Sequence, residues 1–274
     1  MFLVDPLFML GEHITLSSDG ARPDGFCGLG WAKAELPYTF GVIGLNHDFI
    51  GKQPVVGKGM TSPKTCYYHQ GSANTFLSSV YMLLDTQTVI VVLSNSMSPT
   101  DTPGWLGELY LEAVLGNSDK NDYVALATAS AKASLQLWPG MAAKLEKDRK
   151  PGTSPRKLGD YSGKYLNSLR NSEIEIFEVD SQLRLRFQQQ DLVTYPLGYY
   201  HDDTFSWLLT HDENIGVGRF PTIRASYYLI TFLEQSNEPI VVNRLKWIHD
   251  DGYLPGDVFT KTMYDAPAQS TSKM

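Results

Sequence analysis

His69, Gly71 and Ser72 stand close together in the stretch "CYYHQGSANTFLSS", residues 66 to 79, and these residue types can take part in chemistry. A histidine can take up or release a proton near neutral pH, and a glycine lets a backbone approach another group closely. The aromatic run before them predicts a strand, and an apolar hairpin follows. A His-x-Gly pattern is common by chance, so its meaning depends on whether the chain also supplies a nucleophile.

Two downstream patterns match nucleophile motifs in form. Ser154 and Lys157 have the spacing Ser-x-x-Lys, and Tyr165 and Asn167 have the spacing Tyr-x-Asn. Ser154 lies in a Pro- and Gly-rich linker rather than at the start of a buried helix, and Tyr165 belongs to a predicted strand. Motifs this short recur by accident, so we expect neither pair to be catalytic.

Three groups of histidine and acid are the remaining candidates for a metal or acid–base site. They are His201 with Asp202 and Asp203, "HDEN" at 211–214, and "HDDG" at 249–252. We interpret them as turns with solvated acids, because neighbouring residues of a strand point to opposite faces. Lys58 lacks the spacing of a phosphate-binding loop, and Cys27 and Cys66 fit small buried side chains better than metal ligands. The sequence therefore predicts no metal and no cofactor.

The composition of the chain limits the classes of partner that are expected. The 274 residues are 42% hydrophobic, which suits one large domain or two ordinary ones. The net charge of −7 is spread along the chain and argues against nucleic acid or an anionic membrane as partner. The chain has no run of about 18 apolar residues, and "MFLVDPLFML" is a poor signal peptide, so the cytoplasm is the default compartment.

The strands that would position His69 lie in the first part of the chain. "FCGLGW" (26–31) predicts a strand before a long Gly-rich loop, in which Asn46 and His47 could border a pocket. Strands are predicted over 65–72, 76–85 and 88–95. The last two form a hairpin, and "VIVVL" is expected to be buried on both faces.

A helix over 98–116 follows the hairpin. Thr102 is its predicted N-cap, Pro103 lies in its first turn and Gly116 ends it. Its buried face is predicted from the apolar residues, which are Leu106, Leu109, Tyr110, Ala113 and Val114. A second helical region over 121–149 is expected to break at "WPG" (138–140), and a charged linker covers 147–160.

The pattern then changes to period two. In "SEIEIFEV" Ile174 and Ile176 alternate with glutamates, and "QLRLRF" alternates leucines with arginines. The two segments predict a hairpin whose Glu and Arg side chains pair across the outer face, each pair contributing roughly 0.2–1 kcal/mol. Seven or eight short strands predict a β-barrel or sandwich, and the polar tail from 264 is expected to be loose.

The order of these features resembles a known family. "GLGW", the His-x-Gly strand, the hairpin ending in "VVLSNS" and the final helix resemble the C-terminal half of serine β-lactamases and penicillin-binding-protein-like hydrolases, in the class C and esterase-like branch. "YSGKYLN", "LRLRF" and "YHDDTFSW" resemble the lipocalin-like domain fused to many members. The resemblance implies an α+β fold, in which a partial antiparallel sheet with a packed C-terminal helix precedes an all-β lipocalin-like barrel. The implied regions are 1–120 for the partial domain, 121–154 for the connector and linker, 155–263 for the barrel and 264–274 for a disordered tail.

The resemblance also implies roles for the three residues. His69 would supply a hydrogen bond or positive charge near the substrate, and Gly71 and Ser72 would shape an oxyanion hole with the Ser72 backbone N–H as a donor. The substrate would be a small ester, amide or other acyl compound. The family places its Ser-x-x-Lys nucleophile and Tyr-x-Asn motif upstream of this strand, and the 68 residues before His69 contain neither.

Two functions remain open. The first is a β-lactamase-related serine hydrolase present as an N-terminally incomplete chain that is inactive by itself. The second is a non-catalytic pseudoenzyme or binding module whose β-barrel holds a small ligand or a protein. An incomplete domain would leave apolar sheet and helix surface exposed, so self-association is expected as well.

Overall fold

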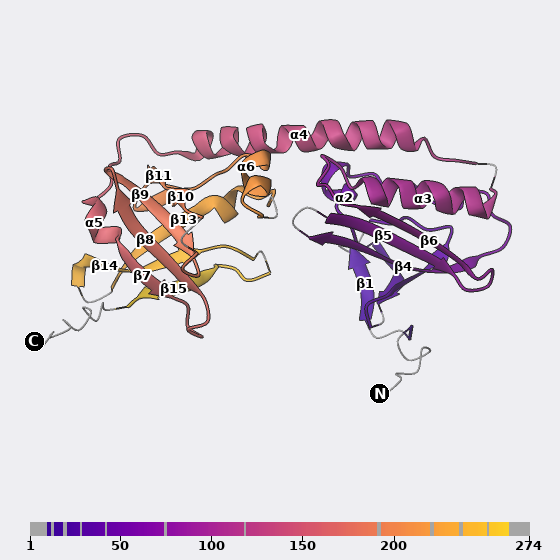
Figure 1. The fold of residues 1–274 in the computed structure, drawn as a ribbon, viewed down its shortest axis with the longest axis horizontal. Coiled ribbons are helices and arrows are strands. Elements are labelled where there is room, and N and C mark those ends of the chain that lie inside the picture. The colour runs from indigo at the N-terminus through magenta and orange to yellow at the C-terminus, as the bar shows by residue number, and fades with distance from the viewer. Residues whose placement is uncertain are drawn as a thin grey trace, which may run out of the picture. The chain divides into compact units, whose positions relative to one another are not determined.

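The computed structural model describes residues 10–11, 14–18, 21–27, 29–41, 43–73, 76–117, 119–190, 193–219, 222–235, 238–250 and 252–262, with backbone alone for those of 14–27 and 235–241. The chain divides into two compact units, and the main boundary lies between Trp138 and Pro139 (Figure 1). Of the helices in the described ranges, none combines the length and the apolar character that a bilayer span requires. The predicted loose tail from 264 lies outside the described residues.

The first unit is built on an antiparallel sheet whose six described strands follow chain order (Figure 1). They are β1 (Ile14–Ser18), β2 (Ala21–Cys27), β3 (Ala32–Leu36), β4 (Lys64–Ala73), β5 (Phe76–Leu83) and β6 (Thr88–Ser94). β4, β5 and β6 confirm the three predicted strands and the hairpin. The strand predicted over 26–31 is wrong, because β2 ends at Cys27 and a positive φ of 84° at Gly30 turns the chain before β3. The alternation of Ala32, Ala34 and Leu36 with Lys33 and Glu35 is the strand signal in what was predicted as a loop.

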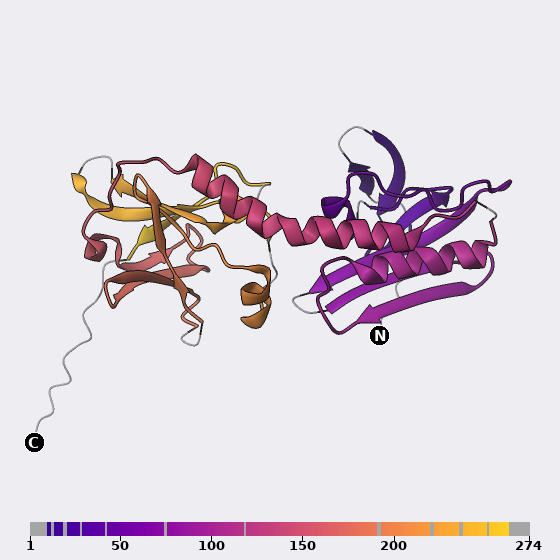
Figure 2. The ribbon, with the colours of Figure 1, turned by 90° about the horizontal axis from the view of Figure 1, so that it is seen from above.

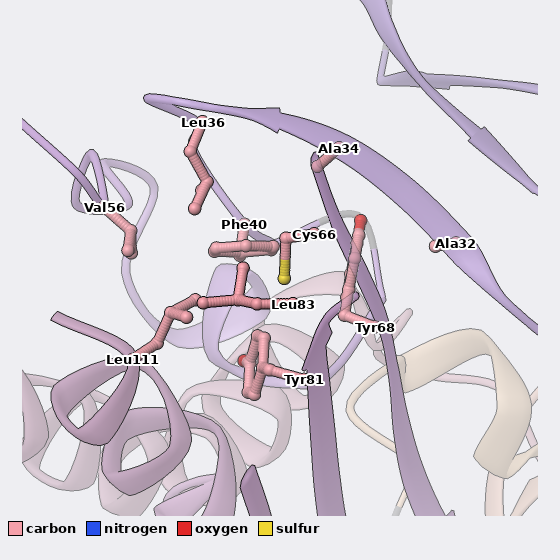
Figure 3. Close-up of a cluster of buried hydrophobic side chains, with 10 residues drawn as sticks. All are labelled: Ala32, Ala34, Leu36, Phe40, Val56, Cys66, Tyr68, Tyr81, Leu83 and Leu111. Atoms are coloured by element: carbon pink, nitrogen blue, oxygen red, sulfur yellow. The ribbon is translucent and has the colours of Figure 1, made fainter. Parts of the chain in front are cut away.

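The core of this unit lies on one face of the sheet (Figure 3). Phe40 packs edge-to-face on Tyr68 and Tyr81, with ring centroids 4.7 and 5.2 Å away. Cys66 is a free thiol fully buried among them, and burial raises its pKa to about 12. The interpretation of Cys66 as a small buried side chain is confirmed; the side chain of Cys27 lies outside the described atoms.

Helix α3 (Thr102–Leu115) lies along this sheet (Figure 2). The face that it buries is opposite to the predicted one. Leu109, Tyr110 and Val114 are 40, 52 and 48% exposed. The buried face instead carries glycines and acids: Pro103, Gly104, Trp105, Gly107, Glu108, Leu111 and Glu112. A Cβ on Gly107 would lie 2.5 Å from the Tyr81 ring, so this glycine lets the helix approach β5 more closely than any side chain would.

The ends of α3 match the prediction in part. The N-cap is Asp101 rather than Thr102, because the Asp101 carboxylate accepts a hydrogen bond from the Gly104 N–H at 3.0 Å. Pro103 lies in the first turn, and Gly116 ends the helix in the left-handed region with φ of 65°.

The β6 strand is exposed on one face, and the prediction that it is buried on both is wrong. It is the outermost strand of the sheet, and Val89, Val91 and Leu93 are 57, 57 and 76% exposed. Its other face packs toward α3. A continuous run of β-branched residues therefore indicated a strand correctly but not its surroundings, because burial depends on what the rest of the chain places over it.

Helix α4 (Tyr123–Asp148) runs through Pro139 without interruption, so the break predicted at "WPG" is wrong. Asp122 satisfies the start of this helix by accepting from the Ala125 N–H at 2.9 Å. The boundary between the two units nevertheless falls at Pro139.

The second unit is a nearly closed antiparallel barrel of nine described strands, which confirms the predicted all-β fold. Its elements are α5 (Leu158–Tyr161), β7 (Gly163–Leu166), β8 (Glu173–Val179), β9 (Gln182–Phe187), β10 (Tyr195–Pro196), β11 (Gly198–His201), β12 (Thr204–Ser206), α6 (His211–Gly216), a 3₁₀ turn (Ala225–Tyr228), β13 (Leu229–Gln235), β14 (Glu238–Trp247) and β15 (Asp257–Lys261). The spatial order begins at β10 and finishes at β11. Only Leu197 separates these two strands in the chain, and its N–H bonds to the Leu183 carbonyl at 2.8 Å, so the two ends of the sheet come together.

Side chains fill the interior of this barrel. Ile174, Ile176, Leu183 and Leu185 are at most 1% exposed, as their alternation predicts. Large rings occupy the rest, chiefly Tyr161, Tyr165, Phe205, Trp207, Tyr228, Phe232 and Phe259. The predicted pairing across the β8–β9 hairpin is confirmed for Glu175 and Arg186, whose Oε2 and Nε atoms are 2.6 Å apart.

Candidate functional site

β4 places His69 and Gly71 on one face of the first sheet and Gln70 on the other, because side chains alternate along a strand. His69 pairs with Val80 of β5, and Val80 pairs with Val91 of β6, so the three side chains form a row across three strands. The row lies on the face opposite to the core and α3. His69 is half-buried within it.

The end of β4 has a free edge within the described ranges. The β3 partnership begins at Ala32, which pairs with Tyr68, while the β5 partnership continues to Ala73. Residues 69–73 therefore have a described strand on the β5 side alone. The predicted site residues His69, Gly71 and Ser72 all fall in this segment, beyond the last described β3–β4 pair.

Gly71 leaves room for a side chain of the neighbouring strand. A Cβ on Gly71 would lie 2.6 Å from the hydroxyl oxygen of Ser78, which is its partner on β5. Ser72 is exposed and belongs to the opposite side-chain face from His69. Sequence reasoning missed Ser78; its position opposite Gly71 follows only once the hairpin register is fixed.

No nucleophile is assembled around His69 in the part of the chain that the structure describes. Its imidazole makes no hydrogen bond or ion pair with any described residue, Ser72 and Ser78 included. A serine hydroxyl needs an adjacent base to become a good nucleophile. The described residues thus hold a strand edge and a histidine without the hydroxyl–base pair that acyl transfer requires.

A buried polar network fixes the other face of β4 against the start of α3. Asn46, in the short helix α2 (Asn46–Phe49), donates to the Asp101 carbonyl at 2.9 Å and accepts from the Thr100 hydroxyl and the Asp101 N–H. The Gln70 side chain lies against Gly104, where a Cβ would come within 2.6 Å. Asn46 is 6% exposed, so it is a structural residue rather than a pocket border. Burial raises the pKa of Asp101 despite its bond to Gly104.

Of the Ser-x-x-Lys and Tyr-x-Asn residues, Tyr165 and Asn167 make structural hydrogen bonds through their side chains. Ser154 is exposed, and Lys157 precedes α5 as its N-cap residue. Tyr165 is fully buried and donates to the Tyr161 carbonyl at 2.6 Å. The Asn167 side chain closes a turn by accepting from the N–H groups of residues 171 and 172.

The His-Asp groups are not one site, but two interpretations need correction. Asp202 and Asp203 form the predicted turn with positive φ, yet Asp203 is not simply solvated, because it accepts from the Tyr161 hydroxyl at 2.5 Å and from Arg156 at 3.1 Å. "HDEN" is the helix α6 rather than a turn; Thr210 and Glu213 form a capping box that starts it.

The third group is also structural. In "HDDG" His249 bonds Asp257 at 2.6 Å, and Asp250 bonds the Gly252 N–H. Across the described residues, no three His, Cys, Asp or Glu side chains are grouped to hold a metal ion.

A cleft of about 580 Å³ in the first unit lies away from the strand edge. Its polar lining comes from Lys52, Gln53, Lys58, Asn121 and Asp122, and its apolar lining from Pro54, Val55, Ala125, Leu126 and Ala129. Lys58 donates to the Asn121 side-chain oxygen at 2.9 Å. The Lys58 ammonium group is thus bound by a neighbouring side-chain amide.

A family model matches part of the chain, from the end of α4 into β14. Residues 147–247 match the family model DUF3471, described as a domain of unknown function, which occurs as a C-terminal domain in β-lactamase-family proteins. No curated protein matches this chain.

Solved structures that are similar include the octameric penicillin-binding protein homologue from Pyrococcus abyssi and SurE. The first is 15% identical over 92% of this chain and 41% of its own, with a TM-score of 0.26; the second is 14% identical over 93% and 41%, with a TM-score of 0.27. SurE with D-Leu is 12% identical over 74% and 36%, with a TM-score of 0.20. The chain spans about two fifths of the length of these proteins, and TM-scores of this size do not establish a shared fold.

Proposed function

We propose that this chain carries the substrate-lining strand of a β-lactamase-related serine hydrolase that acts by acyl transfer on esters, amides or β-lactams. The observation that carries the proposal is the free edge of β4 at residues 69–73, with His69 and Gly71 on one face. An extended substrate can lie along such an edge and accept its backbone hydrogen bonds. The DUF3471 match over residues 147–247 supports the same family, since that domain accompanies β-lactamase-like proteins.

In this proposal each residue has one task. His69 donates a hydrogen bond to the substrate or leaving group. Gly71 has no side chain, so the substrate can come close to the backbone, and the Ser72 N–H stabilises the oxyanion. Removing one such donor typically lowers the rate by about 10²–10³. The attacking serine and its base come from outside the described residues, so the chain alone has no hydrolase activity.

The decisive experiment reads the genomic sequence upstream of Met1. We expect an in-frame Ser-x-x-Lys and Tyr-x-Asn, and the extended protein should hydrolyse a chromogenic ester and react with a fluorophosphonate. A His69→Ala variant should lose activity while still taking up the label slowly. A stop codon directly upstream, or an extended protein without either activity, would contradict the proposal.

The chain as it stands provides a second test. A fluorophosphonate or a fluorescent penicillin should leave it unlabelled, with the extended protein as positive control. Covalent labelling of a serine in the 274-residue chain would show that its active site is already complete.

A non-catalytic binding role is the second candidate. The exposed apolar side chains of β6, which are Val89, Val91 and Leu93, favour a protein partner for it. The barrel interior gives a small ligand little space, because buried rings fill it. A clean upstream stop together with absent labelling would select this candidate.

A further inference from the structure

The cleft of about 580 Å³ in the first unit has two walls that come from distant parts of the chain. One wall is the loop at residues 52–58, and the other is the start of α4, at residues 121–129. Asn121 joins the two walls. Its side-chain amide donates to the Val55 carbonyl at 2.8 Å, and its amide oxygen accepts from the Lys58 ammonium at 2.9 Å. The shape of the cleft is therefore set by bonds between its own walls.

A buried carboxylate holds Asn121 in this position. Glu112 of α3 is 1% exposed, and its two oxygens accept from the Asn121 N–H at 3.1 Å and from the Asn121 side-chain amide at 2.5 Å. On the loop side, the Asn117 side chain donates to the Lys58 carbonyl at 3.2 Å. A site that is already held in place loses little conformational entropy when a ligand binds. These contacts lie within the described residues, so the cleft is preorganised by this chain itself.

The charged side chains of the lining favour an anion. Among the described residues, Lys52 makes no ion pair, and the half-buried Lys58 is bound by the neutral amide of Asn121 and by no carboxylate. Asp122 is the acid of the lining, and its Oδ1 atom accepts from the Ala125 N–H at 2.9 Å, where it caps α4. The positive end of the helix dipole offsets its charge there. Two ammonium groups thus face one carboxylate that is already engaged.

The rest of the lining is apolar. Pro54 is buried and Val55 and Leu126 are half-buried, while the small side chains of Ala125 and Ala129 leave room beside α4. Sites for small molecules usually have volumes of about 300–1,000 Å³ and combine a mostly apolar lining with a few polar groups. The cleft has both properties.

We propose that this cleft binds a small carboxylic acid with an apolar body, such as a medium-chain or aromatic acid. Lys58 and Lys52 bind its carboxylate, and its apolar body packs on Val55, Leu126 and Ala129. A free phosphate fits less well, because it has no apolar surface to place against this lining and its oxygens would lose water there. An apolar amine fits less well because the two lysines repel it.

Isothermal titration of the whole chain with octanoate tests the proposal. We expect a dissociation constant below about 1 mM. Octylammonium, which has a similar apolar body and the opposite charge, should not bind measurably. Lys58→Met keeps the apolar stem and removes the charge, so it should weaken octanoate binding about fivefold or more, as expected for one partly exposed charge pair. Lys132→Gln is the control, since Lys132 is an exposed lysine of α4 outside the cleft. No binding of octanoate, equal binding of the two ions, or equal effects of the two substitutions would overturn the proposal.

A second variant tests the location. Ala129→Trp adds a large ring to the apolar lining at an exposed helix position, so the chain should still fold and should lose measurable octanoate binding. Hydrogen exchange with the wild-type chain should show that octanoate protects peptides from 50–58 and 121–130. Protection confined to β6 peptides, or undiminished binding by Ala129→Trp, would place the ligand elsewhere and overturn the proposal.

The protein extended upstream provides a further test. It should bind octanoate with the same dissociation constant as the 274-residue chain. A loss of binding in the extended protein would show that an upstream segment occupies the cleft, and the proposal would be wrong. None of these experiments uses serine labelling or hydrolysis, so octanoate binding and the proposed hydrolase activity can fail separately.

Discussion

Replacing Glu108 with glutamine should change how the stability of the first unit depends on pH. Glu108 lies on the buried face of α3, is 3% exposed, and has an Oε2 atom without a hydrogen-bond partner among the described residues. Burial raises its pKa well above the usual range, and the nearby Asp101 and Glu112 add to the shift. The folded state therefore favours the protonated acid.

The sign of the effect follows from linkage. Because the folded pKa is raised, the contribution of Glu108 to stability is fully present below its unfolded pKa of about 4.3 and is lost as pH rises through the folded pKa. One proton gives a slope of at most about 1.4 kcal/mol per pH unit over that window. Glu108→Gln keeps the shape and cannot ionise, so its stability relative to wild type should rise steadily above pH 5.

Hydrogen exchange read by mass spectrometry can measure this within the intact chain. Peptides from β4 and β5 should be more protected in Glu108→Gln than in wild type at pH 8, and the gain should shrink toward pH 5. Barrel peptides serve as an internal control, and the exposed Glu178→Gln as a matched variant. A glutamine amide left without a partner would cost about 1–3 kcal/mol, but equally at every pH. A difference between the two proteins that does not vary with pH would refute the reasoning.

Two further substitutions test the packing of each unit. Gly107→Ala should destabilise the first unit by about 1–3 kcal/mol in urea unfolding, because its Cβ would lie 2.5 Å from the Tyr81 ring and 2.6 Å from the Ser79 hydroxyl. Gly140→Ala, in α4 with nothing within 4 Å, should be neutral or stabilising by about 0.5–1 kcal/mol; equal losses in both would contradict the close approach of α3. Arg156→Ala should lower the melting temperature of the barrel, because it removes ion pairs to Asp203 and Glu234 that tie the linker to the strands. Its cost should be about 1 kcal/mol, against nearly nothing for Lys150→Ala, whose pair with Asp202 is more exposed.

The sequence predicted strands well wherever local pattern and surroundings agree. The β8–β9 hairpin, its buried isoleucines and its Glu175–Arg186 pair all follow from period two. One face of the hairpin carries the buried apolar side chains, and the other carries the charged pair. The β4–β6 strands and the Gly116 stop were predictable for the same reason. Each of these signals depends on neighbours within a few residues.

The face of α3 could not be predicted in this way. Hydrophobic periodicity selected Leu109, Tyr110 and Val114, but the helix buries glycines and two glutamates. What decides the outcome is contact with distant residues: Tyr81 needs the space above Gly107, Ser79 donates to the Pro103 carbonyl at 2.6 Å, and Asn121 bonds both oxygens of Glu112. None of these partners is visible from spacing within the helix.

On β4, the side chain that holds the strand in place and the one proposed to act in chemistry belong to adjacent residues. Gln70 points to the polar network of Asn46 and Asp101, which fixes the strand beneath α3, while His69 points to the open face. The free edge beside His69 and the β6 edge lie on opposite sides of β5, about two strand spacings or 10 Å apart. A substitution at His69 can test the proposed chemistry without removing the contacts of Gln70 that hold the strand.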